Sequence, residues 1–123
     1  MKRDQFITEK VMGKCWHEPA MIGRTYREGV HTVHEKACIR CGHYFREDWK
    51  GYDYSTSPAD ILALQQLVMG ADWWKKFGDF CYYKHHAWSN MRKWINTPDY
   101  TKWLFYDPDR FADLVAEFKG WKS

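Results

Sequence analysis

Two short pairs of cysteine and histidine residues constrain the fold of this chain more than any other feature. Cys15 and His17 are separated by one residue, and Cys38 and Cys41 are separated by two and followed by Gly42. A two-residue spacing lets a tight turn aim both sulfurs at one point, and alternate residues of an extended segment project to the same side. A loop of 20 residues joins the pairs, as in many paired zinc sites. The pattern predicts a tetrahedral Zn²⁺ site made by Cys15, His17, Cys38 and Cys41.

The same cysteines admit other interpretations. A redox pair of the thioredoxin kind needs its C-x-x-C at the start of a helix, and the residues around Cys38 do not resemble a helix start. A disulfide is disfavoured in a reducing compartment. Unliganded cysteines that cluster by chance are the third alternative. The fourth ligand also stays open, with His17 favoured over His31, His34, His43 and Cys81.

The predicted zinc site is structural rather than catalytic. Residues 14–54 hold few aliphatic side chains and many turn-formers, so they need an added source of stability. Structural zinc contributes roughly 10–16 kcal/mol to the folding of small fingers. A zinc hydrolase or deaminase remains an alternative, but Glu18 and Glu35 fit neither the H-x-E…C-x-x-C order nor the H-E-x-x-H helix. We therefore expect a structural ion and no enzymatic activity.

Aromatic residues supply most of the apolar material. The 123 residues include 23 of Trp, Tyr and Phe but only 15 of Leu, Ile and Val. Each ring buries roughly 150–250 Å², so this number exceeds what a small core needs. Some rings are expected at the surface, where they can contact a partner. The net charge of +3 does not by itself require nucleic acid.

The pattern predicts an α+β fold, a mostly helical single domain of residues 1–123 with a small zinc-stapled β-hairpin near the N-terminus. Residues 14–54 form the zinc-stapled part and residues 55–123 the helical part. Residues 30–33 and 44–45 are expected to be the arms of the hairpin. A short strand is expected over residues 102–106.

Helix signals are strongest after residue 55. Ser57-Pro58 and Asp107-Pro108 each pair a capping side chain with a proline at the first helical position. The corresponding helices are expected to end at Gly70 and Gly120, with Trp121 folded back on the second. Further helices are expected from Asp72, over residues 86–95, and over residues 4–12, where Asp4 is the expected cap.

One stretch combines basic groups with rings. Residues 80–98 contain no acidic residue, and residues 82–96 have the composition of a surface that binds single-stranded nucleic acid or another partner. We favour the alternative, in which Trp88 faces the core and the basic groups form a solvated helix face. The candidate residues are Lys84, His85, His86, Trp88, Arg92, Lys93 and Trp94.

Membrane and secretion signals are missing from the sequence. No apolar run approaches the ~18–20 residues of a membrane span, and the first residues lack the apolar segment of a secretion signal. We expect a cytoplasmic protein with no membrane partner.

Six short motifs are distributed along the chain: Glu-Lys-Val-Met-Gly at 9–13, Cys-Trp-His-Glu at 15–18, Cys-x-x-Cys-Gly at 38–42, Tyr-Ser-Thr-Ser at 54–57, Trp-Trp at 73–74 and Asp-Pro-Asp-Arg-Phe-Ala at 107–112. They resemble small phage and prophage proteins of unknown function that carry a C-x-H…C-x-x-C pattern, and two of the pieces resemble the phage ABA-sandwich domain. This resemblance implies a virus-encoded accessory protein that acts in the host cytoplasm by binding a host protein, for example to inhibit a defence complex. It supports the four zinc ligands named above, supplies no catalytic residue and leaves the oligomeric state open.

Overall fold

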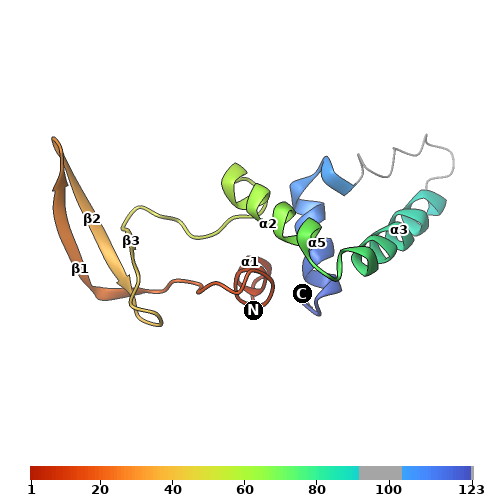
Figure 1. Cartoon of the computed structure of the whole chain (residues 1–123), viewed down its shortest axis with the longest axis horizontal. Coiled ribbons are helices and arrows are strands. Elements are labelled where there is room, and N and C mark those ends of the chain that lie inside the picture. The colour runs from red at the N-terminus through yellow and green to blue at the C-terminus, as the bar shows by residue number, and fades with distance from the viewer. Residues whose placement is uncertain (92–103, 123) are drawn as a thin grey trace.

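The structure is a computed structural model that describes residues 1–91 and 104–122; for residues 86–91 it describes the backbone only. It is elongated, with a three-stranded antiparallel sheet at one end and the helices at the other (Figure 1). Extended segments join the two ends. The predicted α+β class is confirmed.

The sheet is built from β1 (Pro19–Glu28), β2 (His31–Cys38) and β3 (Tyr44–Arg46), in that spatial order. The expected strand at residues 44–45 is present and pairs with the end of β2. Sequence analysis did not predict β1. Val30 lies in the turn between β1 and β2 rather than in a strand, because Gly29 takes a φ of +63° and makes a two-residue hairpin turn there.

The N-terminal residues form a short helical segment, as expected, but its start and type differ from the prediction. Helix α1 (Arg3–Phe6) has Lys2 as its N-cap, with no side-chain cap bond, so the assignment of Asp4 as cap is wrong. The chain continues as the π-helix η1 (Ile7–Val11). Thr8 there donates to the Asp4 carbonyl at 2.8 Å and its hydroxyl also bonds the Tyr54 hydroxyl at 2.8 Å.

Two helices begin where their caps predict. In α2 (Pro58–Gly70), the Ser57 hydroxyl accepts from the Asp60 N–H at 3.4 Å. In α5 (Pro108–Phe118), the Asp107 carboxylate accepts from the Asp109 N–H at 3.0 Å. Each helix also has proline in its first turn, where the missing N–H costs no hydrogen bond.

The segment between these helices corrects two predictions. Helix α3 (Trp74–Met91) runs without a break, so separate helices from Asp72 and from residue 86 are wrong as far as Met91; residues 92–95 lie outside the described part. No proline interrupts α3, and the sequence gives no other reason to stop it. Leu104 and Phe105 are helical, so the strand expected over 102–106 is wrong at these positions. Leu104 is buried in the helical core.

The hydrophobic core belongs to the helical end. Its central ring is Phe77, which is fully buried and contacts Phe111 edge to face with ring centroids 5.9 Å apart. Trp121 folds back as expected, donating from its backbone to Ala116 and from its indole to the Met1 carbonyl, both at 2.9 Å. None of the described helices has the length and apolarity that crossing a membrane requires. The core residues are Ile7, Tyr54, Leu64, Val68, Phe77, Cys81, Leu104, Phe111, Ala112, Leu114, Val115 and Ala116.

Candidate metal centre

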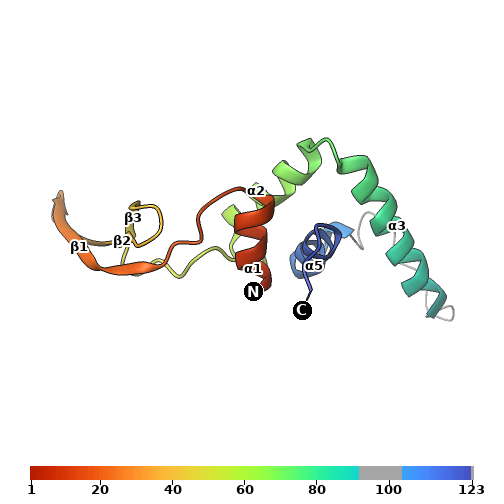
Figure 2. The same cartoon turned by 90° about the horizontal axis from the view of Figure 1, so that it is seen from below.

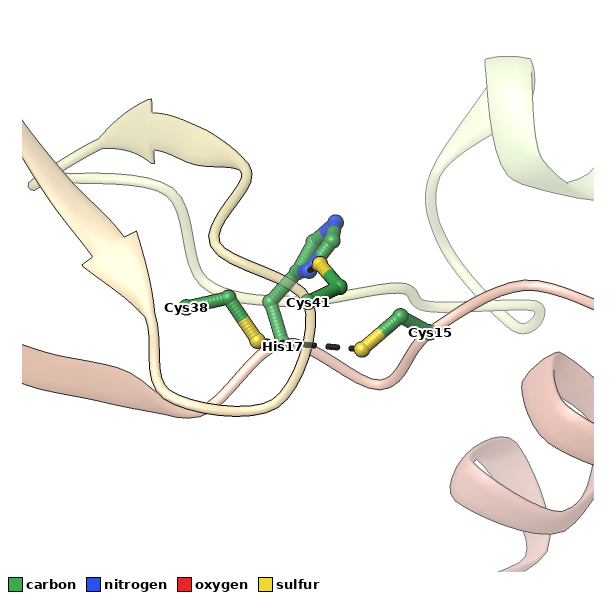
Figure 3. Close-up of side chains that lie close together, drawn as sticks. All are labelled: Cys15, His17, Cys38 and Cys41. Carbon is green, nitrogen blue, oxygen red and sulfur yellow. Dashed lines mark hydrogen bonds between the residues drawn. The ribbon is translucent and has the colours of Figure 1, made fainter.

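The structure brings Cys15, His17, Cys38 and Cys41 together where the sheet meets the helical end (Figure 3). Cys15 and His17 lie on the extended segment between η1 and β1, Cys38 ends β2, and Cys41 lies in the turn that leads to β3. The four candidate ligand atoms all lie within 4.8 Å of one another. Residues from two distant segments of the chain therefore converge on one point.

The turn that holds Cys38 and Cys41 has the geometry of a metal-binding knuckle. Gly42 donates to the Cys38 carbonyl at 2.9 Å, and the Arg40 N–H points at the Cys38 sulfur at 3.4 Å. Gly42 has a φ of +74°, a conformation that a side chain would resist. Glycine after the second cysteine is thus required by the turn that aims both sulfurs inward.

The distances between the donors fit a tetrahedral metal ion. Two sulfurs bound to one Zn²⁺ at about 2.3 Å lie about 3.8 Å apart, and a sulfur and a nitrogen lie about 3.6 Å apart. The Cys15 and Cys38 sulfurs are separated by 3.7 Å, and the Cys41 sulfur lies 3.4 Å from His17 Nδ1. These four residues could therefore hold a metal ion.

The pKa values of the Cys15 and Cys38 thiols are shifted in opposite directions. Burial alone would raise the pKa of Cys38, but hydrogen bonds from the backbone of Cys41, from His17 and from further N–H groups lower it below its ordinary value. Burial and hydrogen bonds to the other two sulfurs raise the pKa of Cys15. Without a cation the cluster therefore stabilises one thiolate at the expense of its neighbour. A bound divalent ion would offset the repulsion between neighbouring thiolates and so favour several thiolates together.

A cluster of rings surrounds His17. Its imidazole stacks on His43 and Phe45, with ring centroids 5.3 and 5.5 Å away, and meets Trp49 at 5.6 Å. Trp49 in turn packs edge to face on Tyr52 at 5.1 Å. This packing fixes the orientation of the imidazole toward the sulfurs. Sequence analysis did not assign Phe45, Trp49 and Tyr52 a role, although the density of aromatic residues between 43 and 54 was a signal for it.

Arg40 connects the site to the helical end and was also missed. This residue occupies the C-x-x-C turn, and its guanidinium binds Glu9 of η1 at 2.6 Å and Glu18 at 3.1 Å. The Ile39 N–H donates to the Glu18 carbonyl at 2.9 Å. The C-x-x-C turn is thus tied to the C-x-H segment by backbone and side chain alike.

The alternative fourth ligands lie elsewhere. His34 Nδ1 bonds the Thr25 hydroxyl at 3.2 Å on the sheet, and His31 begins β2. His43 stacks on His17 but is not one of the clustered donors. Cys81 is fully buried in the helical core, where burial raises its pKa to about 12.

The basic and aromatic stretch is described only in part. Lys84 forms an ion pair with Glu117 at 2.7 Å, and His85 is buried at 9% exposure. Neither side chain is therefore a freely exposed cation of the kind that a phosphate-binding surface needs. The side chains of His86 and Trp88, and all of Arg92, Lys93 and Trp94, lie outside the described residues.

No protein-family model matches the chain, and the searches of curated proteins and of solved structures found no match either. The function must therefore be argued from the site and its surroundings.

Proposed function

We propose that Cys15, His17, Cys38 and Cys41 hold a structural Zn²⁺ and that the protein acts by binding a macromolecule. The observation that carries this proposal is the convergence of three sulfurs and one nitrogen, all within 4.8 Å of one another. Soft thiolate ligands select zinc or iron–sulfur centres, and a set of three cysteines and one histidine is typical of structural zinc.

The carboxylates near the site support binding rather than catalysis. A catalytic zinc keeps one position open and has a free acid or base beside it. The four protein donors here would fill all four positions of a tetrahedral ion. Glu18 is paired with Arg40 at 3.1 Å, and Glu35 is paired with Arg24 at 2.6 Å. Both acids considered from the sequence are therefore held by arginines.

The surface that such an ion would maintain also supports binding. Among residues 13–53, the buried side chains are Val33 and Cys38, so the sheet has almost no core of its own. It nevertheless presents apolar side chains to solvent, with Met21 98%, Ile22 71% and Val30 93% exposed. Exposed apolar groups on a stabilised projection are suited to protein contacts. Together with the phage-like motifs, this favours a host protein as partner and inhibition of a host defence complex as the role.

A capture experiment tests this function. The zinc-loaded protein is immobilised and exposed to bacterial lysate, and each recovered protein is then purified and titrated against it. We expect a complex that resists added salt and is lost in the double variant Met21→Ser, Ile22→Ser. The matched control is Leu62→Ser, which alters a 53% exposed side chain on α2. Equal binding by wild type and both variants would contradict a role for the sheet surface.

Nucleic-acid binding is the second candidate, favoured by two exposed rings of the basic stretch. Tyr82 and Tyr83 are 60% and 71% exposed and precede Lys84. Stacking on such rings contributes roughly 1–3 kcal/mol per base. Oligonucleotide affinity that falls steeply with salt, and that is lost in Tyr82→Ala and Tyr83→Ala, would favour this function over the first.

A further inference from the structure

The outer edge of β1 is an unpaired strand edge. In the described part of the chain, β1 is at the edge of the sheet and pairs with β2 alone. Figures 1 and 2 both place β1 on the side of the sheet that faces away from the helices. Another strand can therefore approach this edge without meeting the helical end. A long exposed edge is a ready template for pairing with another chain.

The register identifies which residues face outward. The His34 carbonyl accepts from the Glu47 N–H at 3.0 Å, so the backbone of His34 is directed toward β3. Thr25 lies opposite His34 in β1. Because antiparallel pairs alternate between hydrogen-bonded and non-hydrogen-bonded, the backbone N–H and C=O of Thr25 point away from β2. The same alternation turns the backbone groups of Gly23 and Arg27 outward.

We propose that two copies of this chain pair antiparallel through β1, about a twofold axis at Tyr26. This inference rests on the metal-held sheet proposed above. Outward-facing Thr25 then lies opposite the partner's Arg27, and hydrogen bonds form between their backbones. On one face of the joined sheet, Arg24 lies opposite the partner's Glu28, and the two copies of Tyr26 lie side by side. Opposite charges and paired rings directly across a strand pair both stabilise it.

Charge complementarity selects this register over its neighbours. If the register between the two β1 strands changes, only a shift by two residues keeps the outward-facing backbone groups of one strand opposite those of the other. An axis at Thr25 would place Glu28 opposite the partner's Ile22, which lies in the irregular stretch between Pro19 and Gly23. An axis at Arg27 would place the two copies of that arginine together. The register about Tyr26 alone gives two opposite-charge pairs by symmetry.

The groups that form these pairs already have neighbours. Arg24 binds Glu35 through Nε at 2.6 Å, and Glu28 lies 3.6 Å from Arg46. Arginine has five N–H donors, so Arg24 can serve both carboxylates. The regular stretch Gly23–Glu28 is short and allows about four backbone hydrogen bonds. We therefore expect a weak dimer with a dissociation constant in the micromolar range.

Sedimentation measurements test the proposal through the backbone. Over concentrations from roughly 10 μM to 1 mM, the mean mass of the wild type should rise from 14.9 kDa toward twice that value. Thr25→Pro removes one outward N–H and leaves the β1–β2 ladder intact, so it should weaken association at least tenfold. Thr25→Val is the matched control, because it loses the same hydroxyl but keeps the N–H. A monomeric wild type, or a dimer unaffected by Thr25→Pro, would overturn the proposal.

A charge exchange tests the register. Arg24→Glu and Glu28→Arg should each dissociate on their own, because each places like charges across the axis. When the two variants are mixed, the introduced charges face each other and the native charges face each other, so a heterodimer should form. Failure of the mixture to associate would refute the register. Zinc content is measured on every sample: a zinc-loaded monomer refutes only the dimer, whereas a metal-free protein refutes the proposed function.

Discussion

The proposed function predicts that removal of the metal unfolds the sheet while the helices stay folded. The perturbation is a strong chelator at neutral pH, or the variant Cys41→Ser, which removes one ligand. In small fingers a structural zinc site contributes roughly 10–16 kcal/mol. Burial of Val33, the buried aliphatic residue of the sheet, contributes only roughly 1.5–3 kcal/mol. The sheet therefore has no comparable source of stability once the ion is gone.

The helical end does not depend on the ion in this way. Its core joins η1, α2, α3 and α5 through buried residues such as Ile7, Val68, Phe77 and Val115. None of these residues contacts the metal cluster through a described hydrogen bond or ring contact. The core should keep its packing, and with it the far-ultraviolet dichroism of the helices.

Amide hydrogen exchange with site resolution is the assay. After chelation, amides of β1, β2 and β3 should exchange at rates near those of an unfolded chain, whereas the central amides of α2 and α5 should keep their protection. Addition of Zn²⁺ should restore the protection of the strands. Strands that stay protected without metal would refute the reasoning about the sheet, and loss of protection in both parts together would refute the independence of the helical core.

Three further predictions concern the helical end. Phe77→Ala should lower the free energy of unfolding by about 3–5 kcal/mol, because Phe77 is fully buried. The control Tyr82→Ala alters a 60% exposed side chain and should change the free energy of unfolding by less than about 0.5 kcal/mol. Equal effects of the two variants in urea titrations would contradict this packing. Asp107→Ala should cost about 1 kcal/mol through loss of the α5 cap, and a neutral result would contradict the cap. Burial raises the pKa of Tyr54 from 10.0 to about 12, against a smaller opposing hydrogen bond with Thr8, so the unfolded chain loses this proton first and stability should fall between those pH values. Tyr54→Phe should make that decline shallower but not remove it, because the buried Cys81 thiol, whose pKa is also raised to about 12, contributes over the same range; an unchanged pH dependence would argue against this reasoning.

The cluster of Cys15, His17, Cys38 and Cys41 could be predicted because its information is local. The C-x-H and C-x-x-C spacings fix the direction of the donors within two short segments, and only their convergence needed the structure. The first residues of α2 and α5 could also be predicted, because a capping side chain followed by proline determines the first turn of a helix. Ser57 and Asp107 accept the hydrogen bonds that this pattern implies.

The long strand β1 could not be recognised from its own residues. A half-buried strand alternates apolar and polar side chains. Every residue of β1 except Ala20 is exposed, so β1 does not need this alternation and its sequence does not show it. The strand forms because it pairs with β2 across a two-residue turn at Gly29. Gly23 is required there, since a Cβ at that position would lie 2.4 Å from the Glu35 carbonyl oxygen. This constraint comes from the neighbouring strand and is invisible in the local sequence.

The strand predicted over residues 30–33 is present from His31, but its first residue, Val30, and the break assumed in α3 were wrong for related reasons. Val30 has strong strand propensity, but the preceding glycine bends the chain and places it in the turn. In α3, two apolar patterns separated by polar residues suggested two helices, although no helix breaker lies between them. Periodicity locates faces that pack, and it marks an end only where a cap or a breaker accompanies it.

The metal content of the purified protein tests the central claim most directly. Elemental analysis should find one zinc ion per chain in the wild type and in His43→Ala, which alters a ring stacked on the site but no ligand. His17→Ala and Cys41→Ser should both lose the ion or bind it far more weakly. A wild type that contains no stoichiometric transition metal and takes up none on titration would contradict the account, as would a zinc content that is the same in all four proteins.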